Sequence, residues 1–350
     1  MFLLADGGLV LSPSDLANAA ACELAVLSNL DGRLGWSQPA PIAADAMLER
    51  VSALGTAHER AVLDAYGATG DVVTIERPRY DEAGERAALE RVQASTLAAL
   101  SSDADVVYQA GFFDGRFTGW ADFVVREGGR WAVLDTKLAR SVKVTALLQL
   151  TAYADQLLTA GIPVTDDVHL ILGDRSRSSH RLADLLPLYR ERRARLEDLL
   201  DEHRSGGTPV TWGDARYRAC GRCDACTARV VAHRDVLLVA GMRSTQRTRL
   251  AAAGVTTIDQ LATGTGAVPG IGVATLANLR RQAALQVRQE TATEPLVFEV
   301  VEPAAIGAGS DQPSRPSRWL STASSQAAAL ARSLGLRTRP PSARRNMRRG

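Results

Sequence analysis

The chain has 350 residues, 46% of them hydrophobic, and a formal net charge of only +2 at pH 7. This length leaves room for two or three domains with apolar cores, and the overall charge by itself selects no class of partner. No apolar run approaches the roughly 18 residues that a membrane helix needs, and the first residues lack the basic start of a signal peptide. We therefore expect a cytoplasmic protein without a membrane partner.

The N-terminal third predicts helices with strands between them. Ser12 to Asp15 form a helix start, with a serine cap and a proline tolerated in the first turn. Apolar spacing then predicts helices over 47–66 and 85–100, and enrichment in Val, Tyr and Phe predicts strands over 72–76 and 106–113.

The middle of the chain has the most regular pattern, which predicts a succession of strands and helices. Strands over 121–126 and 131–136 are joined by the turn signal Glu127-Gly128-Gly129, and residues 144–158 have helical spacing. Residues 168–172 are expected to add a strand to the same sheet, and a long charged helix is expected over 185–203.

Three polar residues lie on these otherwise apolar strands. Asp135 and Lys137 are two apart and share one face of their strand, and a hairpin can bring Asp122 alongside. Two adjacent carboxylates repel each other unless a cation lies between them, and hard oxygen ligands suit Mg²⁺ or Mn²⁺. A surface hairpin with scattered charges is the alternative. Against it, the chain has 39 arginines but only two lysines, Lys137 and Lys143.

The same residues carry a family resemblance. The chain resembles the RecB-like branch of the PD-(D/E)XK nucleases in three motifs that occur in the right order: Gly119-x-x-Asp122, Asp135-Thr136-Lys137 and Gln149-x-x-x-Tyr153. The resemblance implies a restriction-endonuclease-like α/β core, in which helices flank a central mixed sheet. It also implies a Mg²⁺- or Mn²⁺-dependent deoxyribonuclease.

The resemblance assigns roles to these residues. Asp122 and Asp135 would hold the metal, the carbonyl of Thr136 could add a ligand, and Lys137 would orient or activate the water. Gln149 and Tyr153 would contact the DNA strand or support the lysine.

A histidine upstream of the sheet completes the implied metal site. Gly55-x-x-His58-Glu59 resembles the first motif of the RecB-like branch, in which a helix histidine is a metal ligand. A lone histidine on a helix is more often structural, so His58 depends on this context. Glu59 could support the metal ligands or be a plain surface acid, and the sequence favours the surface acid.

The four cysteines suggest a second metal site. Cys220, Cys223 and Cys226 have the C-x₂-C-x₂-C spacing, which is closer to iron–sulfur ligation than to zinc pairs, and Cys22 is the remaining cysteine. The arrangement resembles that of AddB-type and CRISPR adaptation nucleases, which implies a structural [4Fe–4S] cluster held by all four. The gap before the last cysteine is shorter here than in those relatives, and zinc is the alternative.

Residues 233–292 form the second of three predicted segments, after a nuclease domain over 1–232. Short helices are expected over 245–253, 257–262 and 274–289, and Val268-Pro269-Gly270-Ile271-Gly272 resembles the hairpin of a helix–hairpin–helix unit that binds DNA phosphate. A plain turn between packed helices is the alternative.

Residues 293–350 are expected to be a linker and a disordered basic tail. After residue 302 the tail has nine arginines and one acid, and few apolar residues. Nucleases of this resemblance usually continue into a helicase at this point, so a separate helicase is an implied partner. The sequence thus predicts a nuclease for single-stranded or end-containing DNA in repair, recombination or defence. The alternative is a weak or idle iron–sulfur module that binds DNA and depends on a helicase.

Overall fold

The computed structural model describes residues 1–38, 46–78, 84–293 and 295–300. The chain divides into two compact units, Met1–Val297 and Phe298–Gly350, and the description falls almost entirely in the first. The tail predicted after residue 302 lies outside the described residues. No helix in the described ranges is both long enough and apolar enough to span a membrane.

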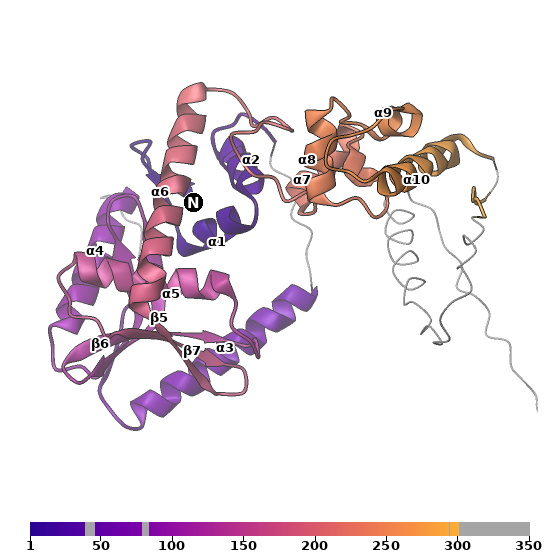
Figure 1. The fold of residues 1–350 in the computed structure, drawn as a ribbon. Helices are drawn as coiled ribbons and strands as arrows, with labels where there is room; N and C mark the ends of the chain where they lie inside the picture. The colour runs from indigo at the N-terminus through magenta and orange to yellow at the C-terminus, as the bar shows by residue number, and fades with distance from the viewer. Residues whose placement is uncertain (39–45, 79–83, 294, 301–350) are drawn as a thin grey trace, which may run out of the picture. The chain divides into compact units, whose positions relative to one another are not determined.

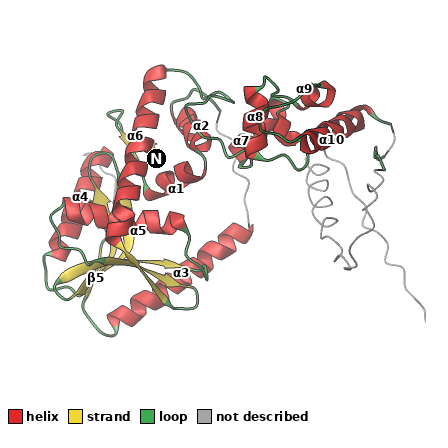
Figure 2. Cartoon of the chain, in the orientation of Figure 1, coloured by secondary structure: helices red, strands yellow, loops and turns green. Residues whose placement is uncertain are grey.

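The centre of the first unit is a mixed sheet of six strands in the order β3-β4-β5-β6-β7-β8 (Figures 1 and 2). Antiparallel pairing joins β4 to β5, β5 to β6 and β7 to β8, while β3 pairs with β4 and β6 pairs with β7 in parallel. The strands span Val72–Thr74 (β3), Val106–Phe113 (β4), Thr118–Glu127 (β5), Arg130–Lys137 (β6), Asp167–Leu172 (β7) and Arg177–Arg181 (β8). The predicted meander and the additional strand predicted over 168–172 are confirmed, whereas the parallel direction of that strand and the presence of β8 were not predicted.

Local sequence accounts for the hairpin at the centre of the sheet. Gly128 and Gly129 have φ angles of 57° and 79°, which residues with a Cβ atom rarely adopt, so the chain reverses there. The buried residues of β5 and β6 are mostly Val, Ala, Phe and Leu, and they lie on both faces of the sheet.

Helices cover both faces of the sheet. The core on one face includes side chains of α4 (Gly84–Leu100), α5 (Val144–Thr159) and the start of α6 (Leu182–Gly206). The core on the other face includes side chains of α3 (Ala46–Gly67). This is the restriction-endonuclease-like arrangement of a mixed sheet flanked by helices.

The N-terminal segment packs mainly against α5 and α6, and Leu11 forms a parallel bridge with Phe117 next to the start of β5. It consists of the short strands β1 (Phe2–Leu3) and β2 (Leu9–Val10), then α1 (Pro13–Ala21) and α2 (Glu23–Arg33), which was not predicted. Ser12 caps α1 as expected, in a capping box with Asp15. The same core includes all four cysteines, three of them from the segment around α7 (Asp224–Ala232).

The last described elements form a small helical cluster with its own core. It contains η1 (Val236–Leu238), α8 (Ser244–Ala252), α9 (Ile258–Thr263) and α10 (Val273–Thr291). The three helices predicted here are therefore present, with ends shifted by one or two residues.

Candidate active site and cysteine site

The two aspartates of the motif lie across from each other at the point where the β5–β6 ladder ends. The last regular pair on that side is Phe123 with Leu134, and the next positions in the same register are Asp122 and Asp135. The Asp122 carboxylate accepts hydrogen bonds from the backbone amide of Thr136 at 3.0 Å and from its hydroxyl at 3.1 Å. The Asp122 side chain thus pairs with the Thr136 backbone at the point where backbone pairing between β5 and β6 stops. The carboxylates of Asp122 and Asp135 therefore lie at one site.

Burial makes this pair of carboxylates unstable as two anions. Asp135 is only 1% exposed, and burial raises its pKa although Lys137 opposes the shift. Burial, followed by the charge of Asp135, raises the pKa of Asp122 to about 7. Lys137 forms an ion pair with Oδ2 of Asp135, yet neither Asp135 oxygen has a hydrogen-bond partner of normal geometry among the described residues. The carboxylate oxygens of Asp135 can therefore still accept hydrogen bonds or bind a cation.

Gln109 in β4 occupies the position opposite Asp122 on its other side. Regular pairs lie directly before and after it, but Gln109 itself has a φ angle of 55° and leaves the ladder. The alternation of β4 reverses there, because Val107 and Ala110 are three apart and still share one core. Asp122 thus lies where both neighbouring ladders are interrupted.

Helix α3 brings two polar residues to the same region. His58 Nε2 lies 3.4 Å from the carbonyl oxygen of Ile171 in β7. Glu59 accepts hydrogen bonds from Tyr108 Oη at 2.8 Å and from Gln109 Nε2 at 2.6 Å. Consecutive helical residues point about 100° apart, so the two side chains reach different strands.

The structure does not gather His58 with both carboxylates into one compact group. In the described part of the chain, the four cysteines are the only set of three or more Cys, His, Asp or Glu ligand atoms within 4.8 Å of one another. Glu59, which reads as a surface acid in the sequence, instead fastens α3 to β4. Its place beside His58 in the motif was the one sequence signal for this contact.

The Gln–Tyr pair of α5 lies against the sheet. Gln149 Nε2 donates to Tyr153 Oη at 3.1 Å, and Tyr153 is buried, stacked on Phe112 with ring centroids 6.1 Å apart. A Cβ atom on Gly119 would lie 2.8 Å from the Tyr153 ring, so glycine in the first motif permits this close approach. Burial raises the pKa of Tyr153, which keeps its hydroxyl protonated.

A cavity of about 560 Å³ opens beside these residues. Its walls come from α1, α3, the end of β6 and the start of α5, and they include Thr136, Lys137, Lys143 and Gln149. This volume is within the roughly 300–1,000 Å³ typical of ligand sites. The motif residues therefore border a space that can admit a substrate.

Comparison with known proteins assigns this arrangement to a family. Residues 10–231 match the model of the PD-(D/E)XK nuclease superfamily. The chain belongs to that superfamily. Among solved structures it is similar to a "Putative exonuclease" from Eubacterium rectale, with 14% identity over 63% of this chain and 87% of the other and a TM-score of 0.33. It is also similar to SSO0001, with 14% identity over 52% and 74% of the two chains and a TM-score of 0.20. No curated protein matches.

PD-(D/E)XK nucleases use divalent metals, and the residues present fit such an ion. Two adjacent carboxylates, one of them buried without hydrogen-bond donors for its oxygens, are a hard, anionic oxygen site. A divalent cation would remove the repulsion between Asp122 and Asp135 and fill the acceptor capacity that Lys137 leaves unused.

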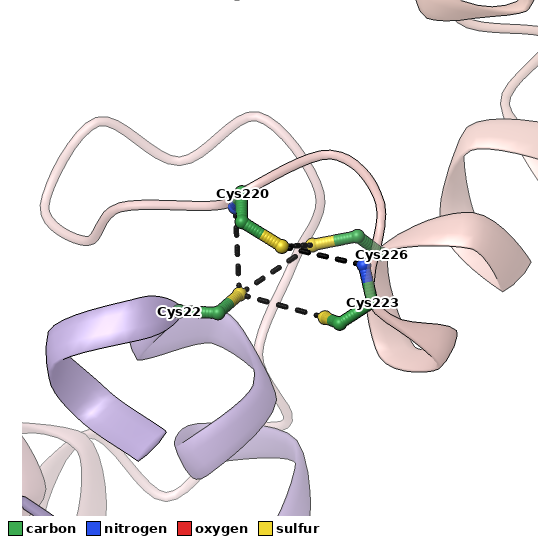
Figure 3. A group of neighbouring side chains, drawn as sticks. All are labelled: Cys22, Cys220, Cys223 and Cys226. Carbon is green, nitrogen blue, oxygen red and sulfur yellow. Dashed lines mark hydrogen bonds between the residues drawn. The ribbon is translucent and has the colours of Figure 1, made fainter. Parts of the chain in front are cut away.

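The four cysteines meet although Cys22 is nearly two hundred residues from the others (Figure 3). The sulfur of Cys22 lies 3.5 Å from that of Cys226 and 3.7 Å from that of Cys223, and the sulfurs of Cys220 and Cys226 are 3.8 Å apart. All four are free thiols, with Cys22 and Cys226 buried.

The local backbone favours thiolates in part of this group. Cys22 and Cys223 occupy the N-cap positions of α2 and α7, but burial raises the pKa of Cys223. Burial acts to raise the pKa of Cys220, but hydrogen bonds from the amides of Arg222 and Cys223 outweigh it and lower the pKa to about 7. Burial raises the pKa of Cys226. A bound metal would supply the charge that holds the remaining sulfurs as thiolates.

Proposed function

We propose that this protein is a metal-dependent deoxyribonuclease that hydrolyses phosphodiester bonds in single-stranded or end-containing DNA. The observation that supports this most strongly is the Asp122–Asp135 pair, in which Asp135 is buried, beside Lys137, which lines an open cavity. Two carboxylates that cannot both be charged without a cation, beside a lysine, match the needs of phosphodiester hydrolysis.

In this proposal each residue has a separate duty. Asp122 and Asp135 hold one or two Mg²⁺ or Mn²⁺ ions with His58, whose side chain must turn from Ile171 to reach them, and the Thr136 carbonyl is a further proposed ligand. The ion would supply charge neutralisation at the phosphate. Lys137 orients the attacking water. As the water oxygen bonds to phosphorus, the phosphorus–oxygen bond to the leaving nucleotide breaks, the water loses a proton to solvent and the leaving oxygen takes one up.

Gln149 and Tyr153 are proposed to line the path of the strand. Gln149 borders the cavity, and its hydrogen bond with Tyr153 fixes its side chain. Because Tyr153 is buried, its duty is to hold Gln149 and α5 in place, while Gln149 faces the DNA.

Residues 233–292 are proposed to be a helix–hairpin–helix-like unit that binds the DNA backbone without reading sequence. Support comes from the hairpin before α10, whose N-cap Gly272 leaves the helix start without a side-chain cap. A guanidinium nitrogen of Arg249 in α8 donates to the carbonyl of Gly270 and holds the hairpin in place.

The cysteine site is proposed to fasten the N-terminal helices to the end of the nuclease domain. The resemblance and the C-x₂-C-x₂-C spacing favour a [4Fe–4S] cluster. Three of the sulfur separations, at 3.5–3.8 Å, with all four sulfurs within 4.8 Å of one another, instead suit a single tetrahedral ion, because Zn–S bonds of about 2.3 Å place sulfurs about 3.8 Å apart. Binding of the larger cluster would require the four sulfurs to move apart.

A cleavage assay tests the nuclease. Full-length protein is incubated with single-stranded DNA and Mn²⁺, as wild type, Asp135→Asn and Lys137→Ala, with an EDTA arm. Asp103→Asn is the matched control, because Asp103 is an exposed acid outside the site. We expect metal-dependent cleavage by the wild type and the control alone. Equal cleavage by all variants would remove this site from the reaction. Binding without cleavage by the wild type would instead support the idle DNA-binding module.

Metal analysis decides the cysteine site. Anaerobically purified protein should contain about four irons and absorb broadly in the visible range if the cluster is present. One zinc in colourless protein would establish the alternative. In either case Cys22→Ser should lose the metal, whereas retention of the full metal content would show that Cys22 is no ligand.

A further inference from the structure

Both lysines of this arginine-rich chain line the same cavity. Lys137 reaches it from the end of β6, and Lys143 reaches it from the residue immediately before α5. The chain contains 39 arginines besides these two lysines. The presence of both lysines at one cavity is therefore not a consequence of a lysine-rich composition.

Lys143 has no evident structural duty. Its side chain is exposed, forms no ion pair or hydrogen bond with any described residue, and does not cap α5. Lys137, by contrast, is paired with the Asp135 carboxylate. An ammonium group that forms no ion pair with a described residue, at the wall of a cavity, is suited to bind an anion from solution.

The position of the cavity indicates which anion this is. Thr136, Lys137 and Gln149 border the same space, so an anion held by Lys143 lies next to the proposed site of cleavage. The first turn of α5 contains no acidic residue that would oppose the anion, and its dipole adds to the positive potential. In a nucleic acid, the anionic groups that repeat along the strand are the backbone phosphates.

The walls away from the lysines are partly apolar. Val51 of α3 is 47% exposed and Leu138 is 37% exposed, and both line the cavity. A space with cations on one side and apolar side chains on another matches a nucleotide, which has a charged phosphate and an apolar base face.

We infer that Lys143 is a positioning residue that holds a backbone phosphate of the DNA strand adjacent to the phosphate that is cut. This inference rests on the proposed nuclease function. Lys137 acts at the scissile phosphate, while Lys143 fixes the register of the strand. Loss of Lys143 should therefore weaken strand binding and raise KM more than it lowers kcat.

Strand binding is measured first without cleavage. Full-length Asp135→Asn protein is titrated with a fluorescein-labelled single-stranded oligonucleotide at several salt concentrations. The same titration is done with three double variants that carry Lys143→Ala, Lys143→Arg or Arg140→Ala in addition to Asp135→Asn. Arg140 is the control because it is an exposed cation in the same loop that does not line the cavity. We expect Lys143→Ala to weaken binding several-fold and to reduce the slope of log K against log salt by about 0.7. Lys143→Arg should keep most of the affinity, and Arg140→Ala should have a smaller effect.

A neutral-linkage scan then locates the phosphate. The same oligonucleotide carries a single uncharged methylphosphonate at each linkage near the cleavage position in turn. One neutral linkage should weaken binding of the protein that retains Lys143 by the same factor as the Lys143→Ala substitution does. At that linkage, the Lys143→Ala protein should show no further loss of affinity.

The outcomes that contradict the inference about Lys143 differ from those that contradict the proposed nuclease function. If Lys143→Ala behaves like Arg140→Ala, or if its penalty persists with every oligonucleotide, the inference is wrong while Asp135-dependent cleavage still supports the nuclease. If wild-type protein neither cleaves nor binds DNA, the proposed function fails and the inference fails with it.

Discussion

Gln109 of β4 faces Asp122 of β5 at the position where the ladder between the two strands is interrupted. The φ angle of Gln109 is 55°, and its side chain accepts a hydrogen bond from Arg77 at 2.8 Å and donates one to Glu59 at 2.6 Å. A residue other than glycine is costly in this conformation, and such residues cluster at functional sites. The hydrogen bonds hold the distortion in place, and the distortion leaves Asp122 outside the β4–β5 ladder.

Two substitutions at Gln109 separate backbone strain from side-chain contacts. Gln109→Ala and Gln109→Gly both lose the hydrogen bonds, but only alanine keeps a Cβ atom at positive φ. We therefore expect the glycine variant to be more stable than the alanine variant by about 1 kcal/mol in urea unfolding of the full-length protein. Both should cleave DNA more slowly than wild type, because α3 and its His58 lose one of the two hydrogen bonds that connect Glu59 to β4. Equal stability of the two variants would show that the conformation is not strained.

Divalent metal should stabilise the folded protein. Mg²⁺ or Mn²⁺ that binds between Asp122 and Asp135 binds only the folded state, so the melting temperature should rise with metal concentration. Asp135→Asn removes a buried charge, so its metal-free melting temperature should exceed that of the wild type and should no longer respond to metal. Asp103→Asn, at an exposed site, should behave as wild type. A lower metal-free melting temperature for Asp135→Asn would mean that its pairing with Lys137 outweighs the cost of burial.

Acid should weaken the contact between β4 and α6. Burial acts to raise the pKa of Asp114, but hydrogen bonds from Gln156 and Arg193, together with the Arg193 charge, outweigh it and hold the pKa below its usual range. A carboxyl group with a lowered folded-state pKa stabilises the fold above its unfolded pKa of about 3.9 and loses this contribution as the pH falls through the folded value.

Asp114→Asn should reveal this contribution. At neutral pH the variant should be less stable by about 1–3 kcal/mol, and the difference from wild type should shrink below about pH 4. Urea unfolding at several pH values measures both. A constant difference across that range would show that the Asp114 charge is not responsible.

Glycine at position 173 allows the ends of β6 and β7 to meet next to Lys137. A Cβ atom there would overlap the carbonyl oxygen of Leu138, which follows Lys137 directly. Gly173→Ala should therefore cost about 1–3 kcal/mol and reduce cleavage by displacing Lys137. Gly206→Ala is the control, because Gly206 ends α6 in open space and alanine is tolerated in helices. Wild-type activity and stability of Gly173→Ala would show that the strand ends adapt without moving the lysine.

The sequence by itself determined the succession of elements from β4 to β7 in the nuclease core, whereas β8 was not predicted. The capping box of Ser12 and Asp15, the glycine turn at 128–129 and the alternation of β5 and β6 are local patterns, and their physical causes act within a few residues. The order and spacing of the aspartates and Lys137 were likewise sufficient to identify the superfamily that residues 10–231 match.

The tertiary structure decided which side chains meet at the site. Glu59 joins β4 about fifty residues away, and Cys22 reaches Cys226 across 204 positions, so no local pattern predicts either contact. The reversal of alternation at Gln109 has no sequence signature, because the residue is not glycine and its conformation is imposed by contacts with Arg77 and Glu59. Local sequence specifies backbone conformation through short-range sterics and hydrogen bonds, whereas the active-site contacts exist only once the helices have packed on the sheet.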